Sequence, residues 1–322
     1  MPNRLERLSR AAKFPEYSPE EIRRAKRRHA ETRHYLVLGD AREVMGAVPG
    51  ESVHLVVTSP PYWTLKEYEH VGGQLGDVQE YGEFLDQLDE VWDECRRVLV
   101  PGGRACLVVG DVCVSRRSRD KRHHVYPLHA DVATRCRKRG LDYLAPILWY
   151  KIANASFEAN ARSTFLGKPN EPNGIVKNDV EYVLLFRKPG RYRSPTTDQR
   201  VLSRIPPDEY RMLFRQLWTD LPGEATRRHP APFPVELASR LVRMFSFVGD
   251  VVLDPFVGTG TTTLAALLHG RNSIGVELVP EYFEAAVGRC RQAALKKGLE
   301  WRVSLTSCTS EEFREIHEKL AG

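Results

Sequence analysis

The sequence has little that would anchor it in a membrane, cross-link it or bind a metal. No stretch approaches about 18 uninterrupted apolar residues, which excludes a transmembrane helix. The six cysteines include no C-x-x-C pair and no Cys/His cluster with metal-ligand spacing, so no bound metal is expected. The first residues are basic and lack the apolar segment of a secretory signal. We therefore expect a cytoplasmic protein.

The charge balance is only mildly basic. The chain has 322 residues and a formal net charge of +6. This excess is compatible with a polyanionic partner but does not require one. The length allows one large domain, or one domain with an insertion.

Hydrophobic patterning predicts an α/β protein with a mostly parallel sheet flanked by helices. Apolar runs bounded by turn residues predict strands at 34–38, 53–57, 104–109, 143–150, 180–186, 251–255 and 273–276. Apolar spacings of three and four residues predict helices at 18–32, 81–99, 127–139, 234–245, 261–269 and 281–297. The alternation of strands and helices is typical of parallel βα units.

A glycine-rich turn joins the strand 251–255 to the helix 261–269. Gly258 and Gly260 permit a tight turn and a close approach of the backbone to a ligand. Glu277 ends the next strand, where it can accept hydrogen bonds from both hydroxyls of a ribose. A dinucleotide also suits this geometry, but threonines replace the third glycine of the phosphate-binding fingerprint. S-adenosylmethionine (SAM) carries no phosphate and suits the turn better.

Two aspartates at strand ends each have alternative roles. Asp254 precedes the turn, where its carboxylate either interacts with the sulfonium of SAM or only braces the turn. Asp40 follows the strand 34–38, where it either accepts a hydrogen bond from an adenine amine or caps a helix.

A proline-rich segment after the strand 53–57 is suited to a nucleobase amine. It reads Ser59-Pro60-Pro61-Tyr62. The Ser59 hydroxyl and the Pro60 carbonyl can each accept a hydrogen bond from the amine, whose lone pair is otherwise delocalised into the ring. Tyr62 offers a flat face for a flipped base. Taken alone, the segment is equally compatible with a proline-rich structural turn.

Together the two motifs resemble the β-class DNA amino-methyltransferases, in which the catalytic tetrapeptide precedes the cofactor motif. The resemblance covers residues 34–297 and implies a circularly permuted, Rossmann-like SAM-dependent methyltransferase fold with an inserted target-recognition region. The family's F-x-G-x-G motif falls on Phe256, Gly258 and Gly260, and its H-P-x-x-F-P segment begins at His229. The implied catalytic residues are Ser59, Pro60, Pro61 and Tyr62. The implied cofactor-binding residues are Asp40, Thr58, His229, Pro230, Asp254, Pro255, Phe256, Gly258, Gly260, Thr261, Thr262 and Glu277.

The first residue of the tetrapeptide bears on the choice of base. Serine resembles the cytosine-N4 branch, whereas aspartate or asparagine resembles the adenine-N6 branch. This is a tendency, so adenine stays open, and an RNA base or a protein glutamine is a further alternative. C5 methylation needs a Pro-Cys nucleophile, and no cysteine follows a proline.

We divide the chain into a basic N-terminal extension (1–33), a catalytic half (34–151), a target-recognition region (152–223) and a SAM-binding half (224–322). A basic run at 115–124 predicts a loop on DNA phosphates. The predicted DNA contacts are Arg116, Arg117, Arg119, Lys121, Arg122 and Lys168. The expected partners are double-stranded DNA and, functionally, a type II restriction endonuclease. We expect a monomer or a homodimer.

Overall fold

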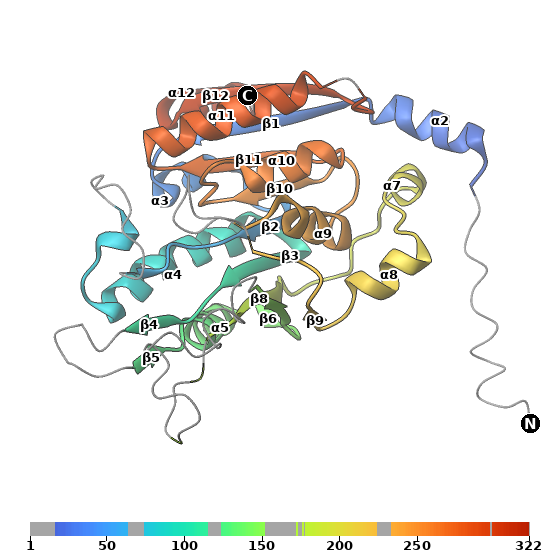
Figure 1. Cartoon of the computed structure of the whole chain (residues 1–322). Helices are drawn as coiled ribbons and strands as arrows, with labels where there is room; N and C mark the ends of the chain where they lie inside the picture. The colour runs from blue at the N-terminus through green and yellow to red at the C-terminus, as the bar shows by residue number, and fades with distance from the viewer. Residues whose placement is uncertain are drawn as a thin grey trace, which may run out of the picture.

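One large sheet with helices on both faces organises the chain in the computed structural model (Figure 1). The structure describes residues 17–63, 74–114, 124–151, 172, 176, 178–223, 233–296 and 298–321. The strands are β1 (Glu31–Leu38), β2 (Val53–Thr58), β3 (Leu99–Val109), β4 (Val112–Val114), β5 (His124–Tyr126), β6 (Asp142–Tyr143), β7 (Ile147–Tyr150), β8 (Val180–Arg187), β9 (Leu217–Trp218), β10 (Val251–Asp254), β11 (Asn272–Glu277) and β12 (Arg302–Thr309). The helices are α2 (Pro19–Arg28), α3 (Ala41–Val44), α4 (Tyr81–Val98), α5 (Leu128–Lys138), α7 (Thr197–Leu202), α8 (Pro207–Leu213), α9 (Val235–Phe245), α10 (Thr261–Leu268), α11 (Pro280–Ala294) and α12 (Ser310–Ala321).

The strand order in the sheet is β12-β1-β11-β10-β2-β3-β8-β7-β9, and β6 also pairs with β8. All neighbours from β12 to β3 run parallel, whereas β8 runs antiparallel to β3 and β7. The mostly parallel α/β sheet is therefore confirmed. Strand β10, which comes late in the chain, lies in the middle of the sheet between β11 and β2. This placement is the permuted order that the resemblance implied.

Alternate residues of the central strands pack against different helices, because successive side chains of a strand point to opposite faces. On one face, Val56 and Leu253 join a core formed with α3, α4, α5 and α12. On the other face, Leu55 and Val252 pack with α9 and α10, while Leu36 of β1 packs with α11. Both faces are covered, which explains why these strands read as continuous apolar runs.

The basic helix α2 begins as predicted but ends earlier. Glu21 N donates to the Ser18 hydroxyl at 3.2 Å, and Ser18 N donates to Glu21 Oε2 at 2.7 Å, which is a capping box. The helix ends at Arg28 because strand β1 begins at Glu31 and pairs with β12 from there. Arg28 forms an ion pair with Asp198 of α7 at 3.0 Å. This ion pair therefore links helix α2 to helix α7.

Several segments differ from the sequence-based expectations. The strand expected at 143–150 is divided into β6 and β7, because Pro146 lies between them and has no amide hydrogen to donate. Strand β12 and helix α12 were not predicted, since β12 is a partly exposed edge strand with few strongly apolar residues. The range 152–223 includes β8, which lies inside the sheet between β3 and β7. This range is therefore not wholly an insertion.

Candidate active site

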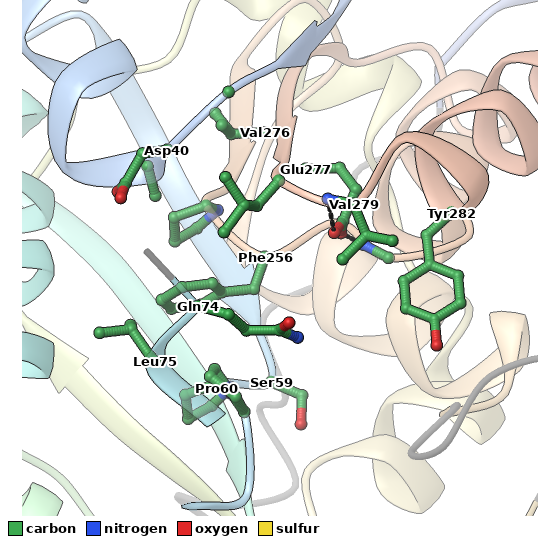
Figure 2. A pocket seen from close by; sticks show the side chains of 16 residues that line it. Asp40, Ser59, Pro60, Gln74, Leu75, Phe256, Val276, Glu277, Val279 and Tyr282 are labelled. Atoms are coloured by element: carbon green, nitrogen blue, oxygen red, sulfur yellow. Dashed lines mark hydrogen bonds between the residues drawn. The ribbon is translucent and has the colours of Figure 1, made fainter. Parts of the chain in front are cut away.

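A cavity opens at the carboxyl ends of β1, β2, β10 and β11, which is where parallel sheets bind ligands. The space within it and at its open mouth is about 680 Å³. Figure 2 shows Asp40 and Val276 toward one end and Ser59 and Pro60 toward the other, with Phe256 between them. The lining residues are Gly39, Asp40, Ala41, Ser59, Pro60, Pro61, Gln74, Leu75, Pro255, Phe256, Gly258, Val276, Glu277, Leu278, Val279 and Tyr282. Residues from both sequence motifs therefore line one cavity.

A buried hydrogen bond joins the two motifs directly. Thr58 Oγ1 donates to Asp254 Oδ1 at 2.6 Å, although the two residues are 196 positions apart in the sequence. Phe256 N donates to the same carboxylate oxygen at 3.0 Å. Burial raises the pKa of Asp254 to about 6. Neither Thr58 nor Asp254 is among the lining residues. Of the two roles considered for Asp254, the geometry thus favours bracing the turn.

Glu277 ends β11 with its carboxylate at the cavity wall. Its Oε2 accepts a hydrogen bond from Gly258 N at 2.8 Å, and its Oε1 accepts one from Val279 N at 2.9 Å (Figure 2). Burial raises the pKa of Glu277 to about 7, although these backbone hydrogen bonds oppose the shift. Each carboxylate oxygen retains a lone pair for a ligand hydroxyl.

Asp40 caps a helix and also lines the cavity. Its Oδ1 accepts a hydrogen bond from Arg42 N at 2.8 Å, which caps α3. Its Oδ2 pairs with the Arg42 guanidinium at 2.5 Å. The helix-cap role is present, and the position in the cavity is compatible with the second role, that of accepting an adenine amine.

The tetrapeptide is only partly open to the cavity. Ser59, Pro60 and Pro61 line it, whereas Tyr62 is 4% exposed and does not. The Ser59 hydroxyl donates to the Tyr62 hydroxyl at 3.3 Å. The Tyr62 ring packs so close to Gly110 that a Cβ there would lie 3.2 Å from its Cε1. The flat face expected for base stacking is therefore covered in this conformation.

An ion pair that no sequence motif indicated lies beside the tetrapeptide. Lys151 Nζ lies 2.5 Å from Glu181 Oε1, and the Glu181 side chain is 14% exposed. A Cβ on Gly110 would meet Glu181 Cγ at 3.3 Å, so Glu181 and Tyr62 approach the same glycine. Other missed residues lie on the cavity wall and belong to no motif: Gln74, Leu75, Val279 and Tyr282. The sequence signal that could have identified Glu181 is its acidic side chain near the start of the predicted strand 180–186.

Three further predicted cofactor residues, besides Thr58 and Asp254, lie behind the cavity wall. Gly260 has φ of +85° at the start of α10, and a Cβ there would lie 3.0 Å from Ala286 Cβ. Thr261 and Thr262 are buried in the first turn of α10. Thr262 Oγ1 donates to the Val57 carbonyl at 3.2 Å. These residues hold the turn against the sheet and so set the shape of the cavity.

Several predicted contacts fall outside the described residues. They are Arg116, Arg117, Arg119, Lys121, Arg122, Lys168, His229 and Pro230. In the described part of the chain, no group of three or more His, Cys, Asp or Glu side chains is arranged to hold a metal ion. None of the helices found in that part is long and apolar enough to cross a membrane.

The charged residues of the cavity lining favour a cationic ligand over one that carries phosphates. Its charged lining residues, among those described, are Asp40 and Glu277. Phosphates bind to cations and N–H donors, whereas these two side chains offer carboxylate acceptors to a ligand. A sulfonium suits this environment, and Phe256, Val279 and Tyr282 provide apolar surface that can flank an adenine. The lining therefore fits SAM better than a dinucleotide.

Comparisons with known proteins agree with this chemistry. TTHA0409 of Thermus thermophilus, solved in complex with S-adenosyl-L-methionine, is 51% identical with a TM-score of 0.70, over 85% of this chain and 98% of that chain. The PvuII DNA methyltransferase, which is cytosine-N4-specific, shares the fold with a TM-score of 0.57 at 22% identity, over 90% of this chain and 94% of its own.

The sequence comparisons place both motifs inside one family. M.MjaI of Methanocaldococcus jannaschii, a type II methyltransferase, is 37% identical over 276 residues, which cover 77% of this chain and 88% of that protein. The N6/N4 methyltransferase family, described as DNA methylase, matches residues 53–288, a range that includes Ser59 and Glu277. The chain belongs to this family and is a SAM-dependent DNA methyltransferase of the N4/N6 class.

Proposed function

We propose that the enzyme methylates the exocyclic N4 amine of a cytosine flipped out of double-stranded DNA. The observation that carries this proposal is that Ser59 and Pro60 line the same cavity as Glu277. Acceptors for an amine therefore lie beside the residues suited to the cofactor. The serine at the first position of the tetrapeptide favours cytosine over adenine, by its resemblance to the N4 branch.

The tetrapeptide acts on the amine through two hydrogen-bond acceptors. SAM, when bound, supplies an electrophilic methyl group on a positively charged sulfur. Ser59 Oγ and the Pro60 carbonyl accept the two amine hydrogens, which favours a pyramidal nitrogen with an available lone pair. Because Ser59 donates its own hydrogen to Tyr62, its oxygen lone pairs point elsewhere and can accept. As the new N–C bond forms, the bond from the methyl carbon to the sulfonium sulfur breaks and S-adenosylhomocysteine is the leaving group. The amine becomes positively charged, and its proton then passes to water.

The proposed cofactor contacts come from the cavity wall, with supporting residues behind it. Glu277 accepts hydrogen bonds from the ribose hydroxyls, and Asp40 accepts one from the adenine amine. Phe256 lies between these residues and the tetrapeptide in Figure 2, where it can pack against the adenine. Thr58 and Asp254 fix the tetrapeptide to the turn through their shared hydrogen bond.

Analysis of the methylated nucleoside tests the proposed base. The purified enzyme is incubated with unmethylated genomic DNA and labelled SAM, and the DNA is digested to nucleosides for mass spectrometry. We expect N4-methylcytosine. N6-methyladenine as the product would contradict the assignment of cytosine but keep the chemistry of the tetrapeptide. Labelled RNA or protein with unlabelled DNA would contradict the proposed substrate.

SAM affinity is expected to fall about tenfold as the pH is lowered from about 8 to about 6. Since the pKa of Glu277 is raised to about 7, its carboxyl is mostly ionised at the higher pH and mostly protonated at the lower. The ionised form can accept hydrogen bonds from both ribose hydroxyls, so binding favours it. Calorimetric titration with SAM at each pH measures the effect. A Glu277→Gln variant with the same dependence would assign the titration to another group, such as Asp254.

We also propose that this enzyme is the modification component of a type II restriction system. The support is that M.MjaI and other relatives are named as type II methyltransferases. A plasmid that the enzyme has methylated should resist a type II endonuclease specific for the same sequence, and undiminished cleavage would contradict this.

The DNA contacts at 115–124 and in the part of 152–223 outside β8 remain predictions. Removing the charges of Arg116 and Arg117 tests them through the salt dependence of DNA binding.

A further inference from the structure

A second cavity lies at the opposite end of the sheet from the active site. The space within it and at its open mouth is about 1450 Å³, and it opens at the amino ends of β2 and β3, near His54, Gly102 and Arg104. Residues of α7, α8 and α9 complete its walls. Figure 1 shows α7 and α8 at the other side of the molecule from α3, which follows the carboxyl end of β1. Among the described residues, the two cavities share no lining residue.

The described lining of this second cavity is strongly cationic. It includes Arg104, Arg193, Arg200, Arg204 and Arg243, and no Asp or Glu. Behind the wall, Asp250 forms an ion pair with Arg193 and Glu209 forms one with Arg243. These two acids offset Arg193 and Arg243, and neither of them pairs with Arg104 or Arg200. The cavity therefore presents a positive potential to its contents.

Among these described arginines, Arg104 is distinguished by a buried guanidinium nitrogen without a hydrogen-bond partner. Its Nη1 is buried, and no group in the described part of the chain accepts a hydrogen bond from it. Burial, and then the charge of Arg187, lowers the pKa of Arg104. A buried donor without an acceptor is costly, and so is an uncompensated charge. An anion in the cavity would offset the charge of this guanidinium.

Exposed aromatic rings surround the arginines. Tyr192 is 73% exposed, Tyr210 is 51% exposed and Phe214 is 42% exposed. The Tyr210 and Phe214 rings stack with their centroids 4.2 Å apart, and the Arg193 guanidinium lies 5.4 Å from the Phe247 ring centre. Flat rings beside guanidinium groups bind bases and phosphates at the same time. An acidic peptide would engage the cations but leave the stacking faces unused.

The geometry points to a second binding site for a nucleoside phosphate, either free or as one unit of a single-stranded polynucleotide. The phosphate pairs with Arg104 and Arg200, and the base stacks on an exposed ring such as Tyr192. The strand β2 spans six residues between the two cavities, or roughly 20 Å. A ligand in this second site therefore does not touch the reacting amine.

Titration with fluorescent ligands tests this site. The full chain is saturated with S-adenosylhomocysteine, which blocks the active-site cavity, and is titrated with labelled thymidine triphosphate or with a short labelled oligothymidylate. We expect binding that weakens with salt. The double variant Arg104→Gln/Arg200→Gln should bind about tenfold more weakly or worse, and so should Tyr192→Ala. Tighter binding of the oligonucleotide identifies a polynucleotide as the source, whereas equal binding identifies a free nucleotide.

The control is Arg211→Gln, because Arg211 lies on α8, pairs with Asp208 and does not line the cavity. It should bind both probes as the wild type does. The inference is overturned if neither probe binds at low salt, or if the double variant binds as tightly as the wild type. Unlabelled inorganic triphosphate that competes as well as thymidine triphosphate would also overturn it, since the rings would then contribute nothing.

Thermal unfolding separates binding from a structural role for Arg104. If Arg104 serves an anion, Arg104→Gln removes an uncompensated buried charge, and the Tm of the free protein should stay equal or rise. In the wild type, thymidine triphosphate should raise the Tm, and in the double variant it should not. A lower Tm for Arg104→Gln together with unchanged probe binding would make Arg104 a structural residue and contradict the proposed site.

Discussion

Replacing Ser59 with alanine is expected to lower turnover about a hundredfold, which is within the range for losing one preorganised hydrogen bond that stabilises the transition state. The variant loses one of the two acceptors proposed to act on the amine. SAM affinity should stay within about twofold of the wild type, because Ser59 lies toward the opposite end of the cavity from Asp40 (Figure 2). Single-turnover methylation of duplex DNA measures the change in turnover, and calorimetric titration with SAM measures the change in SAM affinity.

Two further variants make the Ser59 result specific. Ser52→Ala removes an exposed serine hydroxyl whose partner is the Pro49 carbonyl at 2.7 Å, and it should leave turnover unchanged. Tyr62→Phe removes the oxygen that accepts the Ser59 hydrogen, so it should lower turnover by less than the Ser59 change. Unchanged turnover in Ser59→Ala would remove Ser59 from the mechanism. A matching loss of SAM affinity would make it a cofactor residue instead.

Replacing Glu277 with glutamine is expected to weaken SAM binding by roughly ten- to a hundredfold, the effect of losing charge-assisted hydrogen bonds to the ribose. The carboxylate also accepts hydrogen bonds from Gly258 N and Val279 N. Glutamine keeps a single acceptor oxygen, so one of these backbone donors or one ribose hydroxyl loses its partner. Calorimetric titration with SAM, at a pH of about 8, measures the loss.

The matched control is Glu284→Gln, which changes an exposed glutamate on the following helix α11. Its SAM affinity should equal that of the wild type. The Tm of both variants must be measured, because Glu277 supports the backbone of the turn. SAM affinity of Glu277→Gln equal to the wild type at an unchanged Tm would exclude Glu277 from the ribose contact.

The core strands and the two motifs were predictable from the sequence because their signals are local. The run at 53–57 and the run at 251–255 are apolar on both faces, and both lie in the middle of the sheet. Edge elements carried weaker signals. Strand β12 is partly exposed and pairs along one side only, so few of its residues are strongly apolar. Pro146 already indicated that the strand expected at 143–150 would be divided.

By itself, the sequence determined the order of the motifs, the residues available to an amine and a cofactor, and the mostly parallel α/β class. Only the tertiary structure decided which of these residues line the same cavity. It placed Thr58 against Asp254, so that Asp254 braces the turn, and it buried the Tyr62 ring beside Gly110 and Glu181. The reason is physical: hydrophobic periodicity encodes which face of an element is buried. The contacts between side chains at the ends of different strands depend on how those strands pair in the sheet.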